Sequence, residues 1–187
     1  MQILKQEVKQ RILDSALIEF CDKGYEKASL RQIAQSAGMT VGNIYAYFKD
    51  KNSLMDAVME PIVKDLDKMI IDIASHNDNT LEYLHIVSEQ IVSIYTKYRY
   101  QIMIIMRAMN TEKYSVYKRK LSESITQAIM TQIPSIHDIS LANVIADSVM
   151  AGMLSCFQMM SSLPKEESKK LIYEYLYFMF HLMEVSR

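Results

Sequence analysis

Glycine and proline are scarce in this sequence, and that scarcity limits its possible folds more than any other feature. The chain has 187 residues but only four glycines and three prolines. A β-rich fold needs turn residues about every ten positions, whereas long helices need few. Three glycines, Gly24, Gly38 and Gly42, fall within one stretch of nineteen residues. We therefore expect an all-α fold whose tight turns are concentrated near the N-terminus.

The spacing of apolar residues predicts about nine helices. Ser29 and Thr40 are predicted N-caps, because a hydroxyl can accept a hydrogen bond from a free amide of the first helical turn. Gly24 is predicted to stop the first helix. The predicted ranges are Lys5–Lys23, Leu30–Ala37, Thr40 to Phe48, a helix from the break at 49–51 to about Ser75, and, after a loop at 77–79, Leu81–Tyr98, Gln101–Met109, Glu112–Gln132, Ile139–Ser161 and Lys165–Val185.

The composition is that of an ordinary globular protein with one slightly basic end. Half of the residues are hydrophobic and 23% are charged, and the formal net charge is -1. Such a balance excludes a uniformly basic coat for nucleic acid. Residues 1–51, however, hold eight Lys or Arg against six acids, a net charge of +2. Any nucleic-acid contact must therefore come from a local face.

The sequence does not support a disulfide, a metal site, secretion or a membrane span. Cys21 and Cys156 are isolated, so reduced thiols are expected, and the four histidines have no metal-ligand spacing. The N-terminus lacks the pattern of a signal peptide. The most apolar stretch, 143–160, contains Asp147 and Gln158 and is predicted to be a buried helix rather than a membrane span. We expect a cytoplasmic protein without a cofactor.

Residues 29–48, SLRQIAQSAGMTVGNIYAYF, have the pattern of a helix-turn-helix. Ala34 is small enough for two helices to cross closely, and Gly38 suits the sharp turn between them. Ile44 and Phe48 would hold the second helix inward. Its opposite side would then be free to face a DNA major groove.

This segment resembles the tetracycline-repressor (TetR) family of transcriptional regulators. The resemblance rests on Gly24-Tyr25, Ser29, Ile33-Ala34, Ala37-Gly38, Thr40, Gly42, Ile44-Tyr45, Tyr47-Phe48, Lys51 and Leu54. It implies a three-helix DNA-binding domain, predicted at residues 1–50, and a larger helical ligand-binding and dimerisation domain, predicted at 51–187. The implied activity is that of a repressor, released from a palindromic operator by a small molecule.

The resemblance also implies which residues contact DNA. Arg31 and Asn43 could read base edges, and Lys51 resembles the family's phosphate-binding lysine. The alternative for Tyr45 and Tyr47 is that they close the small core. The full predicted set is Ser29, Arg31, Thr40, Val41, Gly42, Asn43, Tyr45, Tyr47 and Lys51.

Two further sets of residues are predicted in the C-terminal part. A small apolar or cationic ligand could contact a Met- and Tyr-rich group, although core packing is the alternative. The ligand would enter between the fourth and eighth helices, with a kink at Pro61 as a lever, unless the proline only bends the helix around the core. A homodimer could form along the last two helices, unless their stripes pack within one subunit. The ligand group is Tyr95, Met103, Met106, Arg107 and Met109, and the dimer group is Val149, Met153, Phe157, Ile172, Leu176 and Met179.

Two rival functions remain open from the sequence. A helical enzyme would need a phosphate loop, clustered carboxylates or a Cys-His pair, and none is suggested by the spacing. A helix-turn-helix used only for protein contact would show no salt-dependent affinity for DNA. The preferred interpretation is a DNA-binding regulator.

Overall fold

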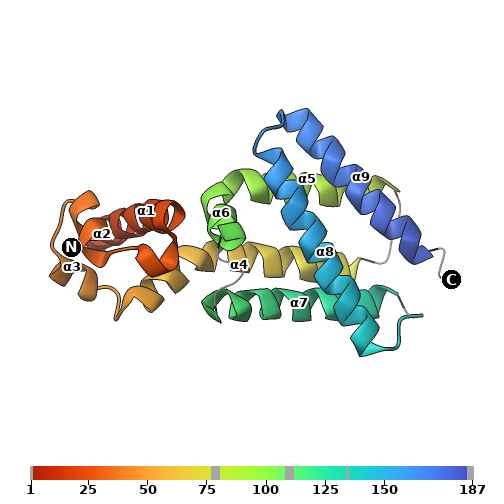
Figure 1. Cartoon of the computed structure of the whole chain (residues 1–187), viewed down its shortest axis with the longest axis horizontal. Coiled ribbons are helices and arrows are strands. Elements are labelled where there is room, and N and C mark those ends of the chain that lie inside the picture. The colour runs from red at the N-terminus through yellow and green to blue at the C-terminus, as the bar shows by residue number, and fades with distance from the viewer. Residues whose placement is uncertain (1, 77–80, 108–111, 134, 185–187) are drawn as a thin grey trace. The chain divides into compact units, whose positions relative to one another are not determined.

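The structure, a computed structural model, describes residues 2–76, 81–107, 112–133 and 135–184. Within these ranges the chain forms nine α-helices and no β-strand (Figure 1), which confirms the predicted all-α fold. The predicted loop at 77–79 and the ends of two predicted helices, Met109 and Val185, lie outside the described residues. The helices are α1 Gln2–Lys27, α2 Leu30–Ser36, α3 Val41–Tyr45, α4 Lys51–Ser75, α5 Leu81–Lys97, α6 Arg99–Arg107, α7 Glu112–Gln132, α8 Ile139–Met160 and α9 Lys165–Glu184.

The chain divides into two compact units, but not at the predicted boundary. The first comprises Met1–Lys64 and Tyr98–Thr111, and the second comprises Asp65–Lys97 and Glu112–Arg187. A division at residue 50 leaves out the first half of α4, which belongs to the N-terminal unit. It also leaves out α6, which packs against α1. The reason is that α4 is one continuous helix through Pro61, so no linker separates the two units.

The N-terminal unit is built around the apolar stripe of α1. Ile12, Ala16 and Phe20 are fully buried at four-residue steps, as expected for one face of a helix. Ile33 of α2 and Leu54 of α4 are also fully buried in this unit. The stripe therefore supplies the core on which the short helices α2 and α3 are held.

Gly24 interrupts the first helix, as predicted, but the helix resumes after it. Its backbone has φ 74° and ψ 164°, a conformation that a side chain would disfavour. The amide of Ala28 donates to the carbonyl of Gly24 at 3.1 Å, so one more turn forms and α1 extends to Lys27. This short turn becomes important at the N-terminus of α4.

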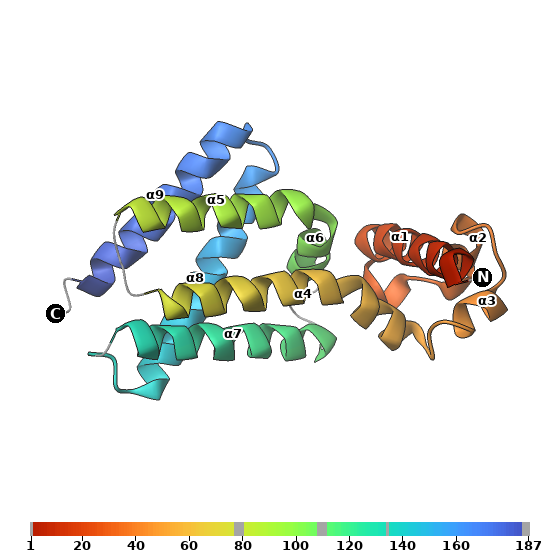
Figure 2. The ribbon, with the colours of Figure 1, turned by 180° about the vertical axis from the view of Figure 1, so that it is seen from behind.

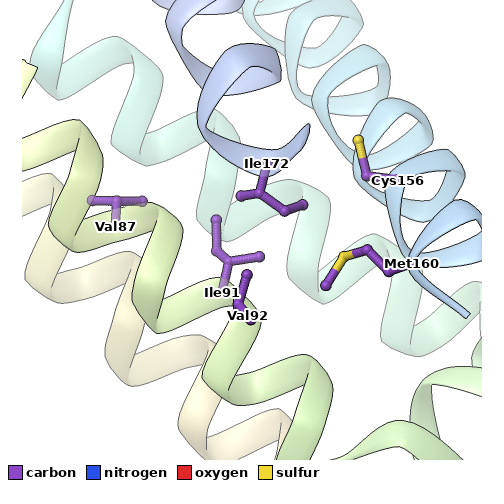
Figure 3. Packing of buried hydrophobic residues seen from close by; sticks show 6 residues of the cluster. All are labelled: Val87, Ile91, Val92, Cys156, Met160 and Ile172. Carbon is purple, nitrogen blue, oxygen red and sulfur yellow. The ribbon is translucent and has the colours of Figure 1, made fainter. Parts of the chain in front are cut away.

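In the C-terminal unit, α5 packs on α9, α7 packs on α8, and α8 also contacts α9 (Figures 1 and 2). One hydrophobic cluster joins α5, α8 and α9 through Val87, Ile91, Val92, Cys156, Met160 and Ile172, as Figure 3 shows. A second cluster joins α7 and α8 around Ile129, Ala142 and Ala146. Helix α8 thus contributes to both clusters.

The stripe predicted as a dimer interface lies largely in the subunit's own core. Ile172 is completely buried, and Met153, Phe157 and Leu176 pack against the same cluster. Val149 is half-buried, and its carbonyl accepts a hydrogen bond from Tyr175 Oη at 3.2 Å. For this face of the two helices, the alternative of packing within one subunit describes what the structure shows, because an amphipathic stripe has the same sequence pattern in a core and in an interface.

The outward face of α8 exposes large apolar side chains among small ones. Val144 and Met159 are 63% and 55% exposed, and Ser148, Ala151 and Ser155 lie exposed between them. This helix is also the one described segment that is long and apolar enough to cross a membrane, although only 22% of the qualifying stretch is buried. An apolar helix that is so poorly covered points to an interaction surface.

Candidate nucleic-acid interface

The turn between α2 and α3 has the geometry that the sequence predicted. Gly38 has φ 70°, in the left-handed region. The amide of Met39 donates to the carbonyl of Ala34 at 2.9 Å, and the amide of Gly38 donates to that of Gln35 at 3.1 Å. These two bonds form a Schellman motif, which ends α2 and turns the chain sharply.

Helix α3 presents one face to the core and the other to solvent. Ile44 and Phe48 are 1% and 5% exposed and hold the segment against the unit. Tyr45 is 56% exposed, so it does not close the core, whereas Tyr47 is half-buried. The helix is shorter than predicted and ends at Tyr45, although Phe48 still donates to the carbonyl of Ile44 at 2.9 Å.

The structure brings most of the predicted DNA-contacting residues onto one short segment. Residues 40–43 open α3, and Tyr45 ends it. Arg31 is exposed in the first turn of α2. The exposed members of the predicted set are Ser29, Arg31, Thr40, Gly42, Asn43 and Tyr45, and Val41 and Tyr47 are half-buried.

The two predicted hydroxyl caps do not form. Thr40 Oγ1 instead donates to Asn43 Oδ1 at 2.6 Å, so the hydroxyl and the amide that would face DNA hold each other. At α2, the amide of Ser29 donates to Glu19 Oε1 at 3.2 Å, and the Ser29 side chain makes no cap bond. Glu19 from α1 therefore supports the start of α2, a role that local sequence spacing did not indicate.

Gly42 has no steric role within the chain. A methyl group at this position would meet nothing closer than Thr40 Oγ1 at 3.7 Å, which is an ordinary contact. Gly42 is exposed and helical. Its lack of a side chain leaves the backbone of α3 open to a partner that approaches from outside.

Lys51 is placed differently from the predicted phosphate contact. Its ammonium donates to the backbone carbonyls of Tyr25, Glu26 and Ala28 at 2.8, 3.2 and 3.2 Å. It also lies 4.5 Å from the centre of the Tyr25 ring. All three N–H donors of the ammonium thus have acceptors within the protein.

The predicted ligand-binding residues are not gathered around one core. Tyr95 stacks on Phe157, with ring centroids 5.4 Å apart, in the C-terminal unit. Met103 and Met106 lie on α6, which belongs to the N-terminal unit. The Arg107 side chain and Met109 lie outside the described residues. For Tyr95, the packing alternative describes what the structure shows.

A family model supports the interpretation of the N-terminal segment. Residues 12–58 match the model described as bacterial regulatory proteins, tetR family. Among curated relatives, the HTH-type transcriptional regulator AcrR of Shigella flexneri is 47% identical over 55 residues, which cover 29% of this chain and 26% of that protein. The chain therefore matches only about a quarter of that relative's length, and AcrR is named as a transcriptional regulator rather than an enzyme.

Solved structures extend the similarity to the whole fold. The fatty acid degradation regulator FadR from Bacillus halodurans has a TM-score of 0.69 at 15% identity, covering 90% of this chain and 94% of that one. AibR, solved with isovaleryl coenzyme A and operator DNA, has a TM-score of 0.64 at 20% identity, covering 89% and 96%. The segment 12–58, which holds α2 and α3, thus matches the tetR family of bacterial regulatory proteins, and the solved structures show that the chain as a whole shares the fold of such regulators.

Proposed function

We propose that this chain is a DNA-binding transcriptional regulator that reads duplex DNA with α3. The observation that carries the proposal is the exposed face of α3, where Thr40, Gly42, Asn43 and Tyr45 are all open to solvent. This face follows a glycine turn of helix-turn-helix geometry inside the segment that matches the family. A helix presented in this way fits a major groove.

The exposed residues have the chemistry for two kinds of contact. Arg31 can donate two hydrogen bonds to a guanine edge, and Asn43 can pair with adenine once its Oδ1 leaves Thr40. The freed Thr40 hydroxyl and the Tyr45 hydroxyl can then donate to phosphate oxygens. Sequence preference is assigned to Arg31 and Asn43, and orientation is assigned to the hydroxyl groups.

Fluorescence anisotropy with labelled duplexes of random sequence tests this proposal. The wild-type chain should bind, and the logarithm of its affinity should fall linearly with the logarithm of the salt concentration. Thr40→Ala, which removes a hydroxyl assigned to a phosphate contact, should weaken binding to these duplexes about fivefold, while Thr131→Ala, the loss of an exposed threonine hydroxyl on α7, serves as the matched control. Absence of salt-dependent affinity would favour the rival, a helix-turn-helix used for protein contact.

The regulator is proposed to act as a homodimer on an inverted repeat. The outward face of α8 runs through Leu141, Val144, Ala151 and Met159 without a charged residue. On α9, Tyr177 and Phe178 are 37% and 59% exposed. A second copy that covers this face would bury apolar surface on both partners. The two reading helices of such a dimer would match half-sites about one helical turn apart.

A small, largely apolar ligand is proposed to release the protein from DNA. Support for a bound small molecule, whatever its polarity, comes from the shared fold with AibR, which was solved with isovaleryl coenzyme A and operator DNA. Because coupling is reciprocal, an inducer must bind more weakly when operator is present, by the factor with which it weakens operator binding. Compounds that raise the melting temperature can be titrated with and without operator. Equal affinity in the two titrations would reject a compound as an inducer.

A further inference from the structure

The first turn of α4 is joined to the last turn of α1 by a cluster of three side chains. Lys51 donates to three carbonyl oxygens, those of Tyr25, Glu26 and Ala28. Its ammonium lies over the ring of Tyr25 at 4.5 Å. The hydroxyl of Tyr25 donates to Oδ1 of Asn52. All of these groups belong to the N-terminal unit.

The carbonyls in this cluster exist in this arrangement because of Gly24. Its positive φ breaks α1, and the turn that follows exposes carbonyl oxygens that no further helical turn can satisfy. A lysine ammonium near a helix C-terminus satisfies such carbonyls and interacts favourably with the helix dipole. Burial by this packing also raises the pKa of Tyr25, helped by Glu26 and by Asp50.

We propose that Lys51, with Tyr25 and Asn52, is a positioning lock that fixes the start of α4 to the corner between α1 and α2 and so sets the orientation of the reading helix. The inference rests on the proposed function, because orientation matters only if α3 reads DNA. Lys51 acts through backbone carbonyls and does not itself contact a phosphate.

The chain connectivity explains how the lock reaches the DNA-contacting surface. Ala28, whose carbonyl Lys51 binds, immediately precedes Ser29, the N-cap residue of α2. At its other end, Lys51 is three residues beyond Phe48, which anchors α3 in the core. The lock therefore connects the two ends of the α2–α3 segment. If the Lys51 hydrogen bonds break, a smaller fraction of molecules holds α3 in the orientation that binds DNA. The apparent DNA affinity then falls by the same factor.

Substitutions at Lys51 separate this role from a phosphate contact. Lys51→Met keeps the length of the side chain but removes its donors, and should lower both the melting temperature and DNA affinity, the latter by about tenfold. The slope of log affinity against log salt should stay at the wild-type value. A lost phosphate contact would instead reduce that slope by about 0.9.

Two further variants and a control sharpen the comparison. Lys51→Arg should fail to restore affinity, because a planar guanidinium cannot direct three donors from one nitrogen, although arginine binds phosphate well. Tyr25→Phe removes the hydroxyl that donates to Asn52 but keeps the ring beneath Lys51, and should weaken DNA binding at an unchanged salt slope. Lys49→Met is the matched control, since Lys49 is exposed and its loss should leave the melting temperature unchanged.

The outcomes separate the lock from the proposed function. A wild-type chain without salt-dependent DNA affinity would reject the function, and the positioning role with it. Suppose that the wild-type chain binds DNA with salt-dependent affinity. A reduced slope of log affinity against log salt in Lys51→Met, or full DNA affinity in Lys51→Arg, would then reject the positioning role of Lys51 but not the proposed function. A lower melting temperature with unchanged affinity would show a purely structural lysine and also overturn it. If Lys51→Met does not fold, Lys51→Arg and Tyr25→Phe decide.

Discussion

At the scale of single residues, Gly42 is a position where a side chain should be compatible with folding but not with DNA binding. The structure leaves room for a methyl group at this helical position, so Gly42→Ala should fold at least as well as the wild type. Alanine in a helix is favoured over glycine by up to about 1 kcal/mol. DNA affinity should nevertheless fall, because the methyl group lies on the face proposed to approach the sugar-phosphate backbone. Thermal unfolding and anisotropy on the same samples measure both effects, and unimpaired DNA binding would exclude close approach at Gly42.

The roles of glycines and of core residues were predictable at this scale, whereas hydroxyl partners were not. Gly38 and Ile44 behave as predicted, because a sharp turn and a helix period are local properties. The caps expected at Ser29 and Thr40 depend on competition between partners. Glu19 approaches Ser29 from another helix, and Asn43 offers Thr40 a nearer acceptor. The Glu19 contact depends on tertiary structure, which local spacing does not encode, whereas the bond between Thr40 and Asn43 is a local alternative to the cap.

At the scale of elements, the start of α4 is held by a reciprocal capping arrangement. Ser53 N donates to Asp50 Oδ1 at 2.7 Å, and Asp50 N donates to Ser53 Oγ at 3.1 Å. The hydrogen bond from the Ser53 amide is the main reason why the pKa of Asp50 lies below its usual 3.8. A carboxyl with a lowered folded-state pKa stabilises the fold above its unfolded-state pKa, and this contribution disappears as the pH falls through the folded-state pKa.

The variant Asp50→Asn tests this pH dependence, since asparagine keeps a capping oxygen without the charge. Its melting temperature should be lower than that of the wild type at neutral pH, where the carboxylate is ionised. The difference should shrink as the pH falls through the lowered folded-state pKa of Asp50, because the carboxyl then becomes neutral like the asparagine side chain. A difference that stays constant across this range would assign the cap's contribution to geometry rather than charge.

A second prediction at this scale concerns the crossing of α8 and α9. A methyl group on Gly152 would overlap Oη and Cζ of Tyr175, which donates to the carbonyl of Val149. Gly152→Ala should therefore destabilise the C-terminal unit by about 1–3 kcal/mol, despite alanine's better helix propensity. In a Tyr175→Leu background the same change should cost little. Denaturant unfolding of the four proteins gives the coupling, and a stabilising Gly152→Ala would contradict the close approach.

Helix positions were largely predictable because apolar periodicity is a local signal, but the use of each apolar face was not. The stripes of α8 and α9 were correctly located, yet Ile172 and Leu176 pack inside the subunit. The other side of α8, with its small serines and Ala151, carries a weaker apolar pattern and was not singled out. A stripe shows that a face is covered, but it does not say which chain covers it.

At the scale of the whole molecule, the division into two units limits how ligand binding could affect the DNA-contacting helix α3. Helix α4 contributes to both units and is continuous through Pro61, and α6 packs against α1 although it follows α5 in the sequence. Composition and the sequence motif predicted a domain boundary directly after the helix-turn-helix. They do not indicate which later helix packs against the N-terminal unit, and so they missed α6. Ligand control, as proposed, would have to act through these connections.

The oligomeric state is the last prediction, and the exposed face of α8 supplies its test. Val144 is 63% exposed within the subunit, so Val144→Glu should leave the fold of one chain intact. In a homodimer built on this face, the buried glutamates would be unpaired and costly, and sedimentation should show a monomer. Gln127→Glu, an exposed change on α7 and not on α8, should remain dimeric. The Val144→Glu monomer should also bind an inverted repeat far more weakly than the wild type, because one reading head makes fewer contacts.

Substitutions in the buried apolar stripe of α8 and α9 should give a different result from Val144→Glu, and the comparison locates the dimer interface. Leu176→Glu places a charge in the subunit core and should unfold the chain instead of splitting a folded dimer. An unaltered dimer in Val144→Glu would move the interface to another surface. A monomeric wild type that floats with lipid vesicles would instead assign the apolar face of α8 to a membrane, the one alternative that the length and hydropathy of Ile139–Met160 allow. Thr126 and Ser122 of α7 donate hydrogen bonds to Asn143 and Asp147 of α8. An α8 surrounded by lipid would lose both bonds, so the vesicle result would place the apolar face of α8 on a membrane surface and not the helix across the membrane.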